Sequence, residues 1–77
     1  MEQLLYLSDL APGEECRVTG LSTKGDMRRR LLDIGLVENT RVRCLGKSPG
    51  GDPSAYLICG AVIAIRAADA RTVLVAR

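Results

Sequence analysis

The sequence predicts a mainly β domain in which short antiparallel strands form a small barrel and one short helix lies against it. Segments with alternating apolar and polar residues recur along the chain, turn residues separate them, and one segment has the spacing of an amphipathic helix. A chain of 77 residues has room for one domain, 1–77, that buries only roughly 60 % of its unfolded surface. An elaborate catalytic cleft is therefore not expected, and we predict that the protein is not an enzyme.

The first half of the chain predicts a strand and then a helix. From Glu15 to Leu21, apolar and polar positions alternate with the period of a strand that has one buried face. Thr23, with Asp26 three residues later, matches the pattern of a helix start, and Gly35 suits the left-handed conformation that ends a helix. The apolar stripe of this helix is expected to consist of Met27, Leu31 and Ile34.

The second half predicts further strands around a dense turn region, Ser48 to Pro53. Gly60 divides two of these strands, and we expect a bulge or bend there. One helical turn is expected near the end, before a last strand that lies beside the first. The predicted elements are strands 40–45, 56–58, 61–65 and 72–75, with the helical turn at 67–70. Five short strands and one helix fit a barrel of the SH3-like class, while an OB-type barrel is the nearest alternative.

Composition restricts the function classes. The formal net charge of +2 is too small to indicate a nucleic-acid-binding face or an anionic membrane surface. The longest apolar stretch, Ala55 to Ile65, is interrupted by Gly60, whereas a membrane-spanning helix needs about 20 apolar residues. The first residues show no secretory signal pattern. We therefore expect a cytoplasmic protein that does not cross a membrane.

The three cysteines, Cys16, Cys44 and Cys59, are far apart in sequence and outline neither a disulfide framework nor a C-x-x-C pair. Histidine is absent, so thiolates and carboxylates would have to form any metal site. Cysteines on predicted strands are more often small buried hydrophobes. We expect no cofactor and no metal site, and these three cysteines with Asp52 are the only weak metal-ligand candidates.

Two polar segments also have ordinary structural explanations. The run from Pro49 to Pro53 combines residues that form rigid turns, although Asp52 could offer its carboxylate to a partner. The basic run from Arg28 to Arg30 spreads over several faces of a helix and does not form one phosphate-binding patch. Two tyrosines are the only aromatic residues, so the chain offers few side chains on which the bases of a single-stranded nucleic acid could stack.

Four short signatures follow one another along the chain: 10–13 (Leu-Ala-Pro-Gly), 30–36 (Arg-Leu-Leu-Asp-Ile-Gly-Leu), 49–53 (Pro-Gly-Gly-Asp-Pro), and 65–75 with Ile65, Arg66, Asp69, Ala70, Val73 and Val75. In this order the chain resembles the FeoA family of small SH3-like proteins. That resemblance implies a role at the cytoplasmic side of FeoB, a membrane protein with a G-protein domain that carries ferrous iron inward. Glu38-Asn39 stands where the family favours proline and glycine, and Asn39 can adopt the left-handed conformation that glycine would use.

The resemblance implies an accessory protein that binds the transporter. The family has no established catalytic residue, so the resemblance assigns none to this chain. The expected partner-binding residues are Met27, Arg30, Leu31, Leu32, Gly35 and Leu36 in the helix region and Pro49, Gly51, Asp52 and Pro53 in the loop. Leu31 and Leu32 are neighbours and cannot both lie centrally on one narrow buried stripe. Either both complete a broad core face, or an exposed leucine anchors the partner. We expect no nucleic acid partner, membrane association only through the transporter, and possible self-association. The alternatives are a metal-responsive module and a small nucleic-acid-associated barrel.

Overall fold

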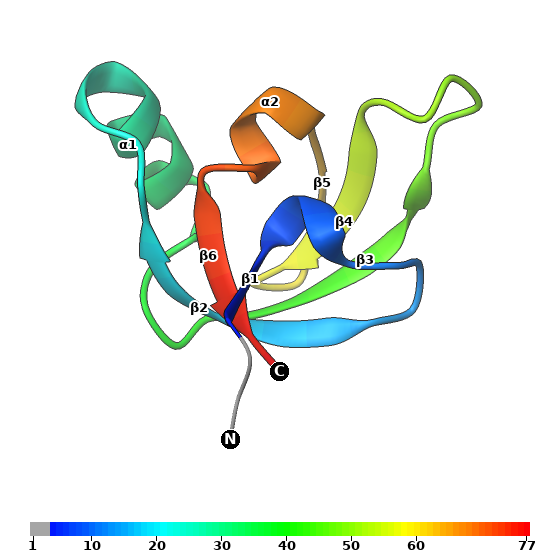
Figure 1. The fold of residues 1–77 in the computed structure, drawn as a ribbon, viewed down its shortest axis with the longest axis horizontal. Helices are drawn as coiled ribbons and strands as arrows, with labels where there is room; N and C mark the ends of the chain where they lie inside the picture. Colours follow the sequence, from blue (N-terminus) through cyan, green and yellow to red (C-terminus); the bar gives the residue numbers. More distant parts are fainter. Residues whose placement is uncertain (1–3) are drawn as a thin grey trace.

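The computed structural model describes residues 4–77, which form one twisted antiparallel sheet with two α-helices above it (Figure 1). In chain order the elements are β1 Leu4–Tyr6, the 3-10 helix η1 Leu7–Asp9, β2 Glu15–Leu21, α1 Gly25–Asp33, β3 Arg41–Lys47, β4 Ser54–Ile58, β5 Ala61–Ile65, α2 Ala67–Ala70 and β6 Val73–Ala76. The predicted strands and the helical turn at 67–70 are confirmed, each within two residues at either end. Strand β1 and the 3-10 helix η1 were not predicted.

The six strands follow the order β1-β6-β2-β3-β4-β5, and every neighbouring pair is antiparallel. Among the described residues, β1 and β5 lie at the two ends of the sheet and do not pair with each other. The antiparallel, mainly β fold is as expected, but the sheet of these residues does not close into a barrel, and the helical turn expected at 67–70 is a second short helix, α2. The chain leaves β5 through α2 and returns as β6 between β1 and β2, so β5 remains an edge strand.

The sheet bends at two register shifts, and neither lies at Gly60. One shift separates Val18 from Gly20 in β2, and the other separates Cys44 from Gly46 in β3. A β-bulge of this kind bends its strand and increases the local twist. Gly60 instead forms, with Cys59, the tight turn between β4 and β5, where both residues have positive φ angles of 82° and 50°. The predicted bulge at Gly60 is thus corrected to a hairpin turn.

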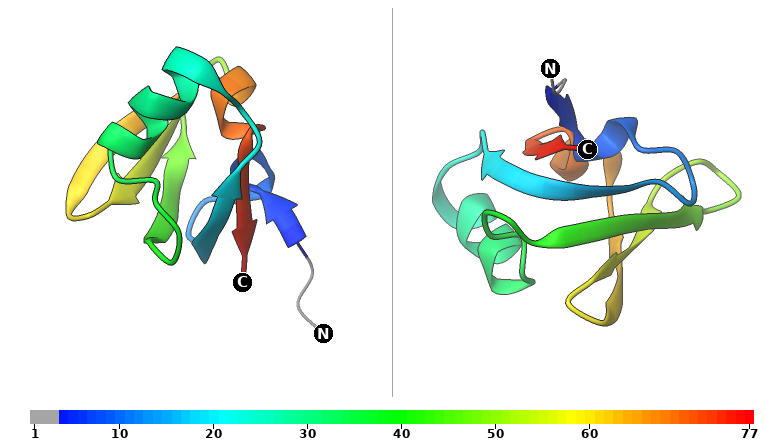
Figure 2. Two further views of the ribbon diagram at one scale, coloured as in Figure 1. Left: turned by 90° about the vertical axis from the view of Figure 1, so that its left-hand side faces the viewer. Right: turned by 90° about the horizontal axis from the view of Figure 1, so that it is seen from below.

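The concave side of the sheet carries the core (Figure 2). Alternate residues of β2, β3 and β4 are buried, as the period-two pattern predicted. Tyr56 is the largest fully buried side chain, and its hydroxyl donates to the backbone oxygen of Leu7 at 3.4 Å. Because η1 contributes Leu7 and Leu10 follows it, the segment before β2 closes one side of the core. In the part of the chain that the structure describes, no helix is long and apolar enough to cross a membrane.

Candidate partner-binding groove

Helix α1 ends as the sequence predicted. Gly35 has a φ of 106°, its N–H donates to the Leu32 oxygen at 3.0 Å, and the N–H of Leu36 donates to the Leu31 oxygen at 3.1 Å. This pair of hydrogen bonds is the Schellman motif, in which a hydrophobic contact usually accompanies the left-handed residue. Leu31 and Leu36 are both buried in the core cluster, so the motif fixes the C-terminus of α1 against the sheet.

The start of α1 differs from the prediction. The helix begins at Gly25 and its cap residue is Lys24, which makes no side-chain hydrogen bond to the helix. Thr23 lies one residue too early to cap the first turn, because the chain is still extended at Lys24, with φ −132° and ψ 172°. Hydrophobic packing therefore stabilises α1, while no side-chain cap stabilises its N-terminus. Leu31 is buried, and Met27 and Ile34 pack against the core.

A groove of about 250 Å³ lies between α1 and the strand β5 with the start of α2. Figure 2 shows α1 along the end of the sheet where the β4–β5 hairpin lies. One wall comes from α1 and the other from the segment from β5 into α2, and together they are formed by Met27, Arg30, Leu31, Ile34, Ile63, Ala64, Ile65, Arg66 and Asp69. Most of these side chains are apolar, while Arg30, Arg66 and Asp69 supply charge. Such a groove can accept an apolar anchor and orient it with charged groups.

Of the ten predicted partner-binding residues, the groove brings together Met27, Arg30 and Leu31. Leu31 is only 4 % exposed and belongs to the core, so it supports the floor of the groove and offers little surface for a partner to contact. Leu36 is fully buried. Leu32 is half-buried on another side of α1, where it lines a shallow hollow with Gly25, Arg28, Arg29 and Asp33.

Gly35 lies against the β4–β5 hairpin. A Cβ atom added there would be 3.0 Å from Sγ of Cys59 and 3.3 Å from Cγ2 of Ile58. Glycine is therefore required at this position both for its φ angle and for the close approach of α1 to the hairpin. Asn39, in the loop that follows, has a φ of 74°, which confirms the predicted left-handed conformation.

The predicted loop residues do not line the groove. Pro49, Gly51, Asp52 and Pro53 lie between β3 and β4, and Figure 1 shows α2 between this loop and α1. Asp52 has a defined structural contact, because its Oδ1 accepts a hydrogen bond of 2.8 Å from the backbone N–H of Ala67, the first residue of α2. The loop therefore supports the helix that carries Asp69 into the groove.

The second wall of the groove was missed as a site, although its residues were partly visible in the sequence. Ile65, Arg66 and Asp69 belong to the family signature at the end of the chain. Periodicity identified Ile65 as a strand residue but could not show which helix it faces. The groove brings residues of α1 and β5 that are roughly 30 positions apart in sequence to its two walls, and only the fold defines this arrangement.

The cysteines do not form a metal centre. Cys16 and Cys44 are buried on β2 and β3, whereas Cys59 is exposed in the β4–β5 turn. Within residues 4–77, no three side chains of the His, Cys, Asp and Glu types lie close enough to hold a metal ion. Burial, aided by the charges of Glu14 and Glu15, raises the pKa of Cys16 to about 11, so this thiol is protonated near neutral pH. A protonated thiol is a poor metal ligand.

The sequence matches a family model, the FeoA domain, over residues 5–77. This chain belongs to the FeoA family. The resemblance drawn from the four signatures is confirmed, and the family is associated with ferrous iron transport. No match was found among proteins with curated functions.

Solved structures agree with the family. A FeoA-like protein from Clostridium acetobutylicum has a TM-score of 0.88 and 29 % identity, over 97 % of this chain and 87 % of that one. Zinc-complexed FeoA from Stenotrophomonas maltophilia, described as a procaryotic SH3 domain protein, has a TM-score of 0.83 and 28 % identity, over 92 % and 88 %. The fold extends further, because a manganese-dependent transcriptional repressor has a TM-score of 0.84 at 20 % identity, over 97 % of this chain and 42 % of the repressor. This FeoA-family chain thus has an SH3-like fold that also occurs as part of a manganese-dependent transcriptional repressor.

Proposed function

We propose that this FeoA-family chain is a non-enzymatic, cytoplasmic accessory protein that binds the G-protein region of a FeoB-type ferrous iron transporter. The observation that supports this proposal is the groove between α1 and β5, which contains Met27, Arg30 and Leu31 on one wall and Ile65 and Arg66 on the other. Both walls come from segments that carry the family signatures.

The groove combines features of a protein-binding surface. Its apolar lining is accessible in part, since Met27, Ile34 and Ile63 are only half-buried, while Arg30 and Arg66 are exposed. Arginine and apolar anchors contribute much of the free energy of binding at protein interfaces. A partner that inserts an apolar side chain and presents a carboxylate to Arg30 or Arg66 would use both the apolar lining and the charged groups of the groove.

Binding alone does not regulate a transporter. If this chain binds one nucleotide state of the G-protein region more tightly than the other, it shifts the population toward that state by no more than the difference in affinity. Equal affinity for both nucleotide states would leave their populations, and thus the transporter's activity, unchanged. The proposal therefore includes a preference for one nucleotide state.

The test is a calorimetric titration of the full chain into the G-protein domain of its transporter, with GDP and with a non-hydrolysable GTP analogue. We expect saturable binding whose Kd differs between the two nucleotides. Arg30→Glu should weaken binding by about tenfold or more, because it reverses a charge in the groove.

Arg29→Glu is the matched control for this experiment. It makes the same charge change on the same helix, but Arg29 lies beside Leu32 and Asp33 and outside the groove. Equal losses for the two variants would show only a general electrostatic effect and would reject the groove as the binding site. An absence of binding to both the domain and the full transporter would reject the proposed function itself.

A further inference from the structure

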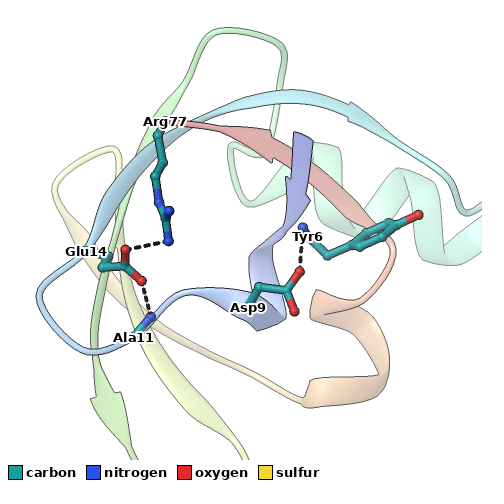
Figure 3. A network of polar contacts seen from close by, with 5 residues as sticks. All are labelled: Tyr6, Asp9, Ala11, Glu14 and Arg77. Atoms are coloured by element: carbon teal, nitrogen blue, oxygen red, sulfur yellow. Dashed lines mark hydrogen bonds and ion pairs between the residues drawn. The ribbon is translucent and has the colours of Figure 1, made fainter. Parts of the chain in front are cut away.

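The two edges of the sheet differ. Strand β1 has only 3 residues and continues directly into η1, where the N–H of Tyr6 donates to Oδ2 of Asp9 at 3.0 Å (Figure 3). Glu14 holds the segment that follows, because its Oε1 accepts the N–H of Ala11 at 2.7 Å while its Oε2 pairs with Arg77 at 2.6 Å. At the other edge, β5 has 5 residues, and none of them is charged or a proline. Strand β5 therefore lacks the features that usually protect an edge strand from pairing.

The free edge of β5 presents the backbone groups of Val62 and Ala64. The β4–β5 hairpin has a two-residue turn, and the residues that flank such a turn, here Ile58 and Ala61, form a hydrogen-bonded pair. Because hydrogen-bonded and non-hydrogen-bonded pairs alternate along an antiparallel ladder, the N–H and C=O groups of Val62 and Ala64 point away from β4. Among residues 4–77, no backbone hydrogen bond formed outside the paired strands and helices uses these groups. The edge thus offers donors and acceptors to a further strand.

The groove between α1 and β5 lies along this edge. Its lining includes the consecutive residues Ile63, Ala64 and Ile65. Successive side chains of a strand point to opposite faces, and that of Ala64 lies on the outward face beside Ala55, its partner in β4. A cavity that contacts all three residues must reach the edge of the strand, not only one face. The groove is therefore a slot with a helix on one side and unpaired backbone groups of a strand on the other.

The charges of the groove indicate what an added strand would carry. Arg30 and Arg66 are exposed, and neither forms an ion pair within the part of the chain that the structure describes. Carboxylates on a bound segment would pair with these guanidinium groups. A second copy of β5 would bring no carboxylate to them, because its residues are only alanine, valine and isoleucine. Charge complementarity therefore favours an acidic segment of another protein over a second copy of this chain.

We propose that the partner occupies the groove as an extended acidic segment that adds a further strand to the sheet at β5. This inference rests on the proposed function, since it specifies the form in which the partner binds in the same groove. Main-chain hydrogen bonds to Val62 and Ala64 give the segment affinity, and its alternate side chains give specificity. Its apolar residues contact the lining of the groove, where Met27 and Ile63 are only half-buried, and the acidic residues between them pair with the two arginines.

The test uses the full chain, labelled with ¹⁵N, and a hexapeptide with blocked termini in which glutamate and valine alternate. Amide shifts and the exchange of amide protons with water are followed during the titration. We expect saturable shifts in the groove and exchange slowed by about tenfold or more at the Val62 and Ala64 amides, because each becomes hydrogen-bonded. The same peptide with lysine in place of glutamate should not bind, since it presents like charge to Arg30 and Arg66.

Ala64→Pro should weaken peptide binding by about tenfold or more, because proline has no N–H and leaves a carbonyl of the peptide without its donor. Proline is tolerated on an edge strand where its nitrogen faces solvent, so the β4–β5 pairing should remain. Glu38→Pro is the matched control. Glu38 is exposed, lies outside the groove, and follows Val37 in a turn closed by a 3.0 Å hydrogen bond from the Thr40 N–H to the Val37 oxygen. Proline is favoured at this turn position, and the Kd should change by less than about twofold.

Binding of the glutamate peptide that slows exchange at Val62 and Ala64 and is lost in Ala64→Pro would support strand addition. If Ala64→Pro does not fold, the exchange measurement on the unsubstituted chain decides. No binding of this peptide, equal binding of the lysine peptide, equal losses in the two proline variants, or unchanged exchange at the two amides would overturn the proposal. A dimer of the free chain in sedimentation equilibrium that Ala64→Pro makes monomeric would also overturn it, because a second copy would then occupy the edge.

The same variants separate this inference from the proposed function. If Arg30→Glu loses binding to the G-protein domain and Ala64→Pro keeps it, the function stands and strand addition is overturned. If neither the G-protein domain nor the full transporter binds while the glutamate peptide does, the function is rejected, and the edge of β5 is a site for an acidic segment of a different partner.

Discussion

The two helices are attached to the sheet in different ways. Helix α1 has 9 residues and begins at Gly25, and the side chain of its cap residue Lys24 makes no hydrogen bond to the helix. An apolar stripe and the glycine motif at its C-terminus hold it. Helix α2 has only 4 residues, but the carboxylate of Asp52 accepts the N–H of its first residue, and Ala70 is fully buried. One helix depends on packing and the other on a polar contact from a distant loop.

This difference matters because each helix contributes to a different wall of the groove. Met27, Arg30 and Leu31 come from α1, whereas Asp69 comes from α2. The two walls therefore respond to different substitutions. Changes to the apolar stripe or to Gly35 should act on α1, and changes to Asp52 should act on α2. Stability and partner binding can then be measured for each wall separately.

Leu31→Ala should have the largest effect on stability. Leu31 is 4 % exposed in the core, and truncation of a buried leucine costs about 2–5 kcal/mol through lost transfer free energy and a cavity. That is a large share of the stability of a small domain. Urea denaturation followed by circular dichroism measures the change.

Leu32→Ala is the matched control for this measurement. Leu32 is adjacent on the same helix but only half-buried, so its truncation should cost clearly less. If both variants lost the same stability, the apolar stripe would not be what holds α1. A folded and stable Leu31→Ala variant would identify Leu31 as a contact residue.

The sequence was most informative where a local pattern reports a local property. Alternation from Glu15 to Leu21 predicted a strand because alternate residues face the core, and Gly35 predicted a helix end because it adopts a φ of 106°. Strand β1 has 3 residues, too few for a period to be recognised. The Thr23 pattern failed because sequence spacing alone does not say where the chain turns into the helix.

Contacts between distant segments were not predictable in the same way. The hydrogen bond from Ala67 to Asp52 links a loop to a helix 15 residues later, and the groove joins α1 to β5. The sequence predicted that the residues from Pro49 to Pro53 form a rigid turn, but not which helix the turn supports. The open edge at β5 follows from where β6 enters the sheet, which no single segment encodes.

Gly35→Ala should have the next largest effect, about 1–3 kcal/mol, because alanine is strained at positive φ and its Cβ would lie 3.0 Å from Sγ of Cys59. Thermal unfolding measures this loss. Gly25→Ala is the matched control: Gly25 also has a positive φ, 69°, but a Cβ there would have no atom within 4 Å. The difference between the two variants isolates the clash with the hairpin.

Cys59→Ala combined with Gly35→Ala sharpens this result. Removing Sγ relieves the closest contact, so part of the lost stability should return, while the strain of the φ angle remains. Equal stability of Gly35→Ala and Gly25→Ala would show that α1 does not rely on close approach to the hairpin.

Asp52→Ala should have the smallest effect and acts on the other helix. It removes the acceptor for the N–H of Ala67, and loss of a helix-capping side chain costs about 1 kcal/mol. Hydrogen exchange at the Ala67 amide should accelerate, while amides of α1 should exchange as before. Asp52→Asn keeps an oxygen acceptor and should lose less stability. If Asp52→Asn leaves stability unchanged but weakens binding to the G-protein domain, the carboxylate itself contacts the partner, and the binding surface extends from the groove across α2 to the loop.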